Sequence, residues 1–409
     1  MVTATADEHE ARRLRSALVD SLRPATPISD RVRQAMLAVP RERFLPGVPL
    51  KDAYSDGIVT THRDADGSVL SCTTIPSTVA GMLEQLDVRP GHRVLEIGAG
   101  TGINAALLAH LAGPDGQVTT IDVLPEAADR ARRHLAAAGY TTVQVITGDG
   151  ARGHQPDAPY DRIIATTAAW DIYPDWTSQA APEARLVIPL RIAGFTREVT
   201  FTRGRQPAGP LWTSVYSHPS GFIKLRGPGH HGERDVPIVP GGQSELRVED
   251  GVTVDQPALV RATGQPPLHR WTGVRSADPA LPDLEIWLAG LGSLTRLINR
   301  RPGHGLAPAT GQGGSLAVLN ETGDTLAYLT FRRGTGETTP PELGVCAYGP
   351  DSDKLADRVV GRIKAWAGEQ PAVNPTIEIY PIGTASPAIS DTLLTTGKEY
   401  TLVAIRATR

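Results

Sequence analysis

The sequence has few cysteines, no long apolar run and no excess of basic residues, and each absence excludes a class of protein. Two cysteines, Cys72 and Cys346, in 409 residues are too few for a disulfide framework or a cysteine-rich zinc site. No apolar run approaches the ~18 residues of a membrane helix, and residues 1–22 lack the apolar centre of a secretory signal. The net charge of −3 argues against a dedicated nucleic-acid binder, which is usually basic. We therefore expect a cytoplasmic protein without a metal, membrane or nucleic-acid partner.

The chain is long enough for two domains, because a single compact domain usually stops growing at ~250–300 residues. Between about residues 75 and 205, short apolar segments alternate with helical patterns. The predicted strands cover residues 93–97, 117–123, 143–147, 162–166 and 185–190. This alternation predicts a parallel α/β sheet with helices on both faces.

The second half of the chain has a different pattern. Residues 206–245 are rich in Gly, Pro and His, which predicts a linker or long loop. Beyond it, an amphipathic helix is predicted over residues 352–367. The predicted strands of this half cover residues 284–288, 315–319, 325–331, 343–347, 376–380 and 401–405. We therefore expect an appended C-terminal α+β domain.

The strongest local motif is the run Glu96-Ile97-Gly98-Ala99-Gly100-Thr101-Gly102, which follows a predicted strand and opens a helix. Its glycines allow a tight turn and the close approach of a ligand, and the helix start offers unpaired N–H groups. Asp122 ends the next strand, where its carboxylate can accept hydrogen bonds from ribose hydroxyls, and Val123 follows it. The pattern predicts a nucleotide-type cofactor site. The alternative is a glycine turn that only lets the helix pack closely on the strand.

The spacing of the glycines distinguishes two cofactors. A dinucleotide site has G-x-G-x-x-G, because a pyrophosphate rests on the helix start. This chain has G-x-G-x-G, preceded by Glu96, whose carboxylate repels a pyrophosphate but suits the sulfonium and ammonium groups of S-adenosylmethionine (SAM). We therefore favour SAM over NAD. Farther along, the turn of Asp149 and Gly150 can place Asp149 against the adenine amino group; otherwise Asp149 is an ordinary turn residue.

Over residues 32–189 the chain resembles the protein-L-isoaspartate O-methyltransferase family in the order and spacing of its motifs. The matching stretches are 39–46 (VPRERFLP), 53–56 (AYSD), 94–102 (VLEIGAGTG), 148–150 (GDG), 158–164 (APYDRII) and 186–189 (LVIP). The resemblance implies a Rossmann-like class I SAM-dependent methyltransferase fold. It also implies methyl transfer from SAM to a free side-chain carboxylate in a peptide, with S-adenosylhomocysteine as the product. The ester then tends to collapse to a succinimide (aspartimide).

The resemblance also points to catalytic residues. The family usually has a Thr-Ile-Ser-Gln-Pro-like segment ahead of the glycine motif, with its Ser near the reacting groups. Here the segment reads Cys72-Thr73-Thr74-Ile75-Pro76, so Thr74 takes the Ser position. An aspartate is already ionised at neutral pH and needs no general base, so Thr74 would orient it. Thr74 can instead cap the following helix, and Thr73 can share either role.

Three aromatic residues are candidates for contact with the substrate. Tyr54 belongs to the matching stretch 53–56. Trp170 and Tyr173 follow the fourth predicted strand, and substrate loops gather at that end of parallel strands. The alternative is that Trp170 and Tyr173 simply cover the edge of the sheet.

The C-terminal half has no counterpart in the repair enzyme of this family. With its segment Gly221-Phe222-Ile223-Lys224-Leu225-Arg226-Gly227, it resembles homologues found beside actinobacterial ribosomally synthesised peptides. That resemblance implies methylation of an aspartate in a modified precursor peptide, giving succinimide or isoaspartate. Two alternatives stay open: general repair of isoaspartyl damage, and a SAM-binding scaffold that transfers no methyl group.

Together these observations divide the chain into four expected segments. Residues 1–74 would form N-terminal helices and a substrate-side loop, and residues 75–205 the SAM-binding core. Residues 206–245 would form the linker or long loop, and residues 246–409 the α+β accessory domain.

Overall fold

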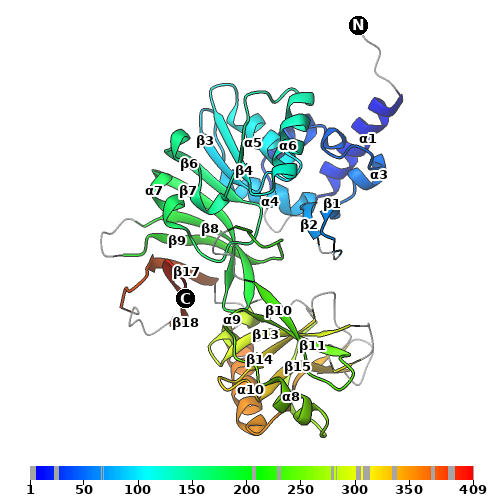
Figure 1. Ribbon diagram of the computed structural model, residues 1–409, viewed down its shortest axis with the longest axis vertical. Coiled ribbons are helices and arrows are strands. Elements are labelled where there is room, and N and C mark those ends of the chain that lie inside the picture. Colours follow the sequence, from blue (N-terminus) through cyan, green and yellow to red (C-terminus); the bar gives the residue numbers. More distant parts are fainter. Residues whose placement is uncertain are drawn as a thin grey trace.

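The computed structural model shows two lobes, each built around its own β-sheet (Figure 1). It describes residues 6–22, 27–65, 67, 69–204, 209–227, 232–277, 281, 283–300, 305–306, 314–333, 339–369, 374–385 and 392–408.

The larger lobe contains a ten-stranded sheet in the order β18-β19-β17-β9-β8-β7-β6-β3-β4-β5. Its parallel half is formed by β3 (Arg93–Ile97), β4 (Gln117–Asp122), β5 (Gln144–Thr147), β6 (Tyr160–Ala165) and β7 (Ala180–Ile192). Neighbouring residues in these strands are buried on opposite faces, as for Val94 and Leu95, which belong to different cores. Both faces of the parallel half are therefore covered, which explains its nearly continuous apolar strands.

Helices cover one face of this parallel half. They are α4 (Pro76–Leu86), α5 (Ile103–Ala112) and α6 (Pro125–Ala137), with α1 (Ala6–Ser21) and α2 (Asp30–Ala38) packed outside them. The short elements between α2 and α4 are η1 (Arg41–Phe44), α3 (Leu50–Ala53), and the hairpin of β1 (Val59–Arg63) and β2 (Val69–Thr73). On the other face lie α7 (Pro174–Gln179) and the turns η2 (Gly150–Arg152) and η3 (Gln155–Asp157).

The other half of the sheet is antiparallel. It runs from β7 through β8 (Phe195–Arg203) and β9 (Trp212–Pro219) to three strands from the end of the chain. These are β17 (Asn374–Pro381), β18 (Thr392–Gly397) and β19 (Thr401–Thr408). The C-terminal strands thus return to the sheet that the N-terminal half begins.

The smaller lobe contains a seven-stranded antiparallel sheet in the order β10-β11-β13-β14-β15-β16-β12. Its strands are β10 (Glu233–Pro237), β11 (Ser244–Glu249), β12 (Leu268–Arg275), β13 (Ser293–Asn299), β14 (Ser315–Leu319), β15 (Leu326–Arg332) and β16 (Glu342–Tyr348). Its helices are α8 (Gln256–Thr263), α9 (Leu284–Ala289) and α10 (Ser352–Glu369). Helix α10 packs on β12, β15 and β16, and also on α9.

The two lobes share one hydrophobic core. Apolar residues of the second face of the large sheet join those of α9, α10 and β14 to β16 in a single buried cluster. At this junction Arg197 of β8, which is 1% exposed, forms ion pairs with Glu285 at 2.8 Å and with Asp283 at 2.7 Å. The lobes are therefore packed together and not merely tethered.

The structure confirms the α/β sheet and the appended α+β region, and it corrects several local predictions. Residues 284–288, expected as a strand, form helix α9; all six residues of α9 are buried, and so short an apolar run has no period that distinguishes helix from strand. The expected linker 206–245 contains β9 and β10, although residues 205–208 and 228–231 lie outside the described residues. The division into four domains stays a prediction, and β17 to β19 of the expected accessory domain pair with the first sheet.

Within the described residues, we find no helix that combines the length and the apolar character needed to cross a membrane.

Candidate functional site

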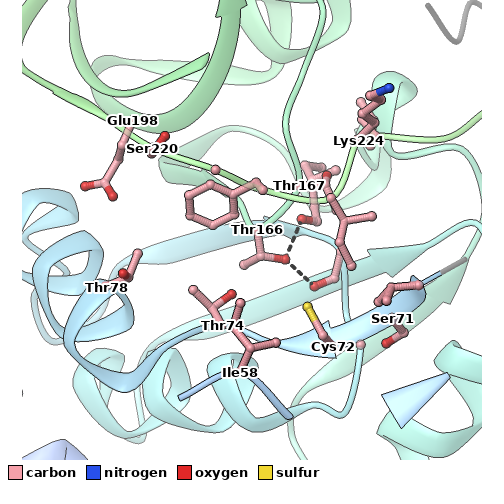
Figure 2. Close-up of a pocket in the computed structure, with 18 of the residues that line it drawn as sticks. Ile58, Ser71, Cys72, Thr74, Thr78, Thr166, Thr167, Glu198, Ser220 and Lys224 are labelled. Atoms are coloured by element: carbon pink, nitrogen blue, oxygen red, sulfur yellow. Dashed lines mark hydrogen bonds between the residues drawn. The ribbon is translucent and has the colours of Figure 1, made fainter. Parts of the chain in front are cut away.

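A cavity of about 970 Å³ opens at the carboxyl ends of β3, β4 and β6. Open parallel sheets bind ligands at this edge. The β1–β2 hairpin and α4 form one side of the cavity, while β8, β9 and the segment 219–226 close it from another (Figure 2). We call residues 219–226 the roof segment. It is joined to the loop after β6 by Ala168, whose N–H donates to Ile223 O at 2.7 Å and whose carbonyl accepts from Leu225 N at 2.8 Å.

The first two glycines of the motif shape the floor of this cavity. Gly98 has φ +100°, and a Cβ there would lie 2.5 Å from the Thr166 hydroxyl. That hydroxyl donates to the carbonyls of Ile97 and Gly98 (Figure 2). Gly100 has φ +54°, and the nearest atom to its missing Cβ is Ser71 Oγ at 3.9 Å. Gly100 therefore leaves its backbone open to a ligand, as the cofactor prediction requires.

The third glycine serves packing. Gly102 has φ +88°, and a Cβ there would lie 3.1 to 3.3 Å from Leu135 and Ala131 of α6. Gly102 therefore lets the start of α5 approach α6, which is the alternative role considered for the whole motif.

Asp122 holds the glycine turn at the edge of the cavity. Its Oδ2 accepts from Gly100 N at 3.0 Å, and its Oδ1 accepts from Leu124 N at 3.0 Å. Asp122 and Val123 both line the cavity. Each carboxylate oxygen has a second lone pair, so Asp122 can also accept hydrogen bonds from a diol.

Glu96 lies outside the cavity wall. Strand alternation turns its side chain toward α5, where its carboxyl accepts from Asn104 at 2.8 Å and from the Thr120 hydroxyl at 2.5 Å. Glu96 is fully buried, and this burial raises its pKa to about 7. The geometry makes Glu96 a tie between β3, β4 and α5, and its contact with the cofactor stays a prediction.

The two candidate residues of the turn after β5 have different surroundings. Gly150 lines the cavity. Asp149 Oδ1 instead accepts from Ala151 N at 3.0 Å, and a Cβ on Gly227 would lie 2.7 Å from the same oxygen. Asp149 therefore caps its own turn, as the turn alternative expects, and lies next to Gly227, which follows the roof segment.

The two candidate catalytic threonines have different surroundings. The Thr73 hydroxyl accepts from Arg41 Nη2 at 2.9 Å and from Val59 N at 3.3 Å, so it fixes the β1–β2 hairpin. Thr74 lines the large cavity, and Figure 2 shows its side chain between Cys72 and Thr78. Burial raises the pKa of the Cys72 thiol, which keeps this neighbour uncharged. Of the two threonines, Thr74 is the one placed to meet a substrate.

A second, smaller cavity of about 70 Å³ adjoins the glycine loop. Ala99 and Thr101 line it, together with Thr73 and Thr74. The Thr101 hydroxyl is buried without a hydrogen-bond partner among the described residues. Ala99 and Thr101 therefore lie behind the loop, next to the main cavity.

The three aromatic candidates lie away from the walls of both cavities. Tyr54 is buried, and its hydroxyl bonds to Glu42 and Arg15. Arg191 and Lys398 both lie over the ring of Trp170, with Lys398 Nζ 3.4 Å from the ring centre. Tyr173 packs on Trp176 and Tyr400. Lys398 and Tyr400, in the turn between β18 and β19, pack on Trp170 and Tyr173. Contact of the three aromatic residues with the substrate stays a prediction.

Several cavity residues were not anticipated. They lie on α4, on β8, after β6 and on the roof segment: Thr78, Thr166, Thr167, Glu198, Ser220, Phe222, Lys224 and Arg226. The roof residues carried a weak signal, since 221–227 belongs to the quoted extension. A lone Glu in the strand sequence Phe-Thr-Arg-Glu-Val-Thr-Phe gave no comparable signal.

The described residues fit SAM. Gly100 leaves room for close approach, Asp122 can accept from the ribose, and Val123, Leu124 and Gly150 supply an apolar and backbone wall. SAM supplies an electrophilic methyl group when it is bound. The rest of the cavity, from Thr74 to Glu198 and the roof segment, is available to a methyl acceptor.

Comparison with known proteins agrees with this geometry. The family model described as protein-L-isoaspartate(D-aspartate) O-methyltransferase matches residues 12–207. The protein-L-isoaspartate O-methyltransferase of Methanopyrus kandleri is 44% identical over 186 residues, which cover 45% of this chain and 80% of that protein. The enzyme of Hyperthermus butylicus is 43% identical over 199 residues, 46% of this chain and 80% of its own.

Solved structures of similar proteins include a protein-L-isoaspartate O-methyltransferase with a TM-score of 0.48 and 19% identity, covering 84% of this chain and 89% of that one. Another is a Plasmodium falciparum homologue in complex with S-adenosyl-L-homocysteine, with a TM-score of 0.44 and 16% identity, covering 53% of this chain and 98% of that one. On the strength of the sequence relatives, the chain belongs to the protein-L-isoaspartate O-methyltransferase family of SAM-dependent enzymes.

Proposed function

We propose that this enzyme methylates an Asp or isoAsp side chain of a ribosomally synthesised, modified peptide, and that succinimide or isoaspartate forms afterwards. Methylation of isoaspartyl groups is the activity of the family. Our proposal goes further in naming the acceptor, which is a dedicated, conformationally constrained peptide.

A dedicated acceptor is supported by the residues that line the acceptor side of the cavity, since part of that side lies outside the family match. The roof segment 219–226 lies beyond the residues 12–207 that match the family model. Lys224 of the roof pairs with Glu233 of β10 at 2.8 Å, and Glu233 also pairs with Arg191 at 3.3 Å. The second lobe is therefore joined directly to the surface that an acceptor would meet.

In methyl transfer to a carboxylate, the enzyme's side chains mainly need to position the two reacting groups. A carboxylate is already the nucleophile; its oxygen gains the methyl group as the bond from that carbon to sulfur breaks. Holding the reacting groups in line lowers the barrier, and in well-oriented intramolecular reactions this effect reaches ~7–11 kcal/mol. The Thr74 hydroxyl can donate to the acceptor carboxylate without the tight ion pairing that would weaken the nucleophile.

General repair of isoaspartyl damage is the second candidate, since it is consistent with the family assignment. Three peptides of matched sequence distinguish the two: a linear isoaspartyl peptide, its linear Asp counterpart, and a cyclised Asp peptide. We expect the highest kcat/KM with the cyclised peptide. Preference for the linear isoaspartyl peptide would support repair, and SAM binding without turnover on any of them would support a scaffold.

A further inference from the structure

Glu198 is a buried acidic side chain on the wall of the cavity. It lies on β8, directly opposite His218 of β9, and is 6% exposed. Among the described residues it has neither a hydrogen bond nor an ion pair. Figure 2 shows its carboxyl in the same part of the cavity as Thr78 and Ser220, well separated from Lys224 and Ser71. A carboxylate in so buried a place is poorly solvated, so a cationic ligand in the cavity would stabilise its charged form.

Two hydroxyls on the same cavity are also unsatisfied. Thr167 Oγ1 and Ser220 Oγ are buried without a hydrogen-bond partner among the described residues. Buried polar atoms are almost always hydrogen-bonded in folded proteins. These two hydroxyls and the unpaired carboxyl of Glu198 all line the same cavity, which indicates a polar ligand on the acceptor side.

The charges around the cavity favour a cation near Glu198. Asp122, the other acidic side chain on the described wall, accepts from two backbone N–H groups. Lys224 is engaged by Glu233, and Arg197, next to Glu198 in sequence, pairs with Glu285 and Asp283 at the lobe junction. His218 and Arg226 also line the cavity, but no ion pair joins Glu198 to either of them or to any other described residue.

We infer that Glu198 binds a positively charged group of the peptide substrate, an ammonium or guanidinium, and that Thr167 and Ser220 bind polar groups of the same peptide. This inference rests on the proposed methylation of a peptide. It assigns substrate selection to Glu198: a cation held there would direct a nearby Asp or isoAsp toward Thr74.

Burial raises the pKa of Glu198 to about 7, which makes this selection pH-dependent. Above that pH the carboxyl is ionised and can pair with a cation. Below it the carboxyl holds a proton, and the affinity for a cationic peptide falls. If Glu198 stayed protonated and bound only peptide amides, the affinity would not depend on the charge of the peptide.

The test measures binding to the intact enzyme loaded with S-adenosylhomocysteine, by calorimetry at about pH 8. Isoaspartyl peptides carry Lys or norleucine at each position flanking the isoAsp, with free or acetylated N-termini, so side-chain and terminal cations are distinguished. We expect the best Lys peptide, or the free terminus, to bind about tenfold to one-hundredfold more tightly than its neutral partner. The Glu198→Gln variant should reduce this ratio to about one, whereas the same substitution at exposed Glu183 should preserve it.

Equal discrimination by the wild-type and Glu198→Gln enzymes, or none by the wild type, would overturn the inference. Its failure is distinguishable from failure of the proposed function, because methylation of the neutral peptides is measured separately. The isosteric Gln keeps the shape of the wall, and an unchanged affinity for S-adenosylhomocysteine checks that the site is intact.

Discussion

At the scale of single residues, the cofactor half of the site depends on Asp122. Its carboxylate accepts hydrogen bonds from the backbone N–H groups of Gly100 and Leu124. The remaining lone pairs of the carboxylate are available to a ligand in the cavity. Asp122→Ala should weaken SAM binding by about 1–3 kcal/mol, the usual cost of leaving such partners unpaired. Calorimetry measures this loss, with Asp115→Ala in an exposed turn as the control. Unchanged affinity in Asp122→Ala would refute the ribose assignment.

Thr74 and Thr73 allow the orienting and structural roles to be separated. Thr74→Ala should lower kcat while the KM for SAM stays near the wild-type value, because the hydroxyl faces the acceptor side. Thr74→Ser, which keeps the hydroxyl, should recover most of the rate. Thr73→Val should lower the melting temperature, because Thr73 accepts from Arg41 and Val59. Steady-state kinetics in which Thr74→Ala matches the wild type would leave Thr74 without an orienting role.

Glu198 predicts a dependence of stability on pH. Its folded pKa of about 7 lies above the ordinary value of 4.5, so the folded state holds more protons than the unfolded state between these pH values. The free energy of unfolding should therefore fall as pH rises through this window, by on the order of 3 kcal/mol for this group. Glu96 acts in the same direction. Thermal melts from about pH 5 to 8 should show a smaller decline in Glu198→Gln than in the wild type or in Glu183→Gln. Equal declines would place the titration elsewhere.

At the scale of elements, Gly102 couples α5 to α6. Gly102 and Gly139 have nearly the same positive φ, +88° and +89°, but only Gly102 has neighbours close to the missing Cβ. Ala at either position carries a penalty of about 1–2 kcal/mol for the left-handed backbone conformation, and Gly102→Ala adds overpacking of about 1–3 kcal/mol. Denaturant unfolding should show Gly102→Ala clearly less stable than Gly139→Ala. Equal losses would mean that the α5–α6 contact tolerates a methyl group.

The elements that the sequence predicts well are those with a strong local pattern. Strand β3 and the glycine turn follow from a short apolar run with Gly98 and Gly100, and α10 follows from its apolar stripe. Helix α9 is mispredicted as a strand because its residues are buried on all sides. Strands β9 and β10 are missed because both lie in the segment 206–245, whose Gly, Pro and His content is typical of a loop.

Within the site, too, the residues that the sequence predicts are those with a local pattern. Asp122, Val123, Gly100 and Thr74 lie on the cavity because each follows a strand end or a recognisable motif. Glu198 could not be predicted, since its exposure to the cavity depends on how β8 pairs with β9. Contact of Trp170 and Tyr173 with the substrate stays a prediction; the sequence could not show that Lys398 and Tyr400, in the turn between β18 and β19, pack on them.

At the scale of the whole molecule, the last three strands of the chain belong to the same sheet as the N-terminal half. Strand β17 pairs with β9, and β19 and β18 complete the sheet at whose edge the candidate SAM site lies (Figure 1). Ending the chain at residue 373 would remove these strands and expose the edge of β9. We expect a substantially lower midpoint of denaturant unfolding and self-association of the shortened protein, measured by light scattering. A shortened protein that stays monomeric and equally stable would show that the C-terminal strands are dispensable to the large sheet.

We propose that the cavity at the glycine turn binds SAM and directs its methyl group to a side-chain carboxylate of a peptide. This is tested by incubating the enzyme with isotopically labelled SAM and a peptide that contains a single isoAsp or Asp, followed by tandem mass spectrometry. We expect one labelled methyl ester on that carboxylate, with succinimide appearing later. Label on nitrogen or sulfur, or no label on any isoaspartyl or cyclised Asp peptide, would contradict it.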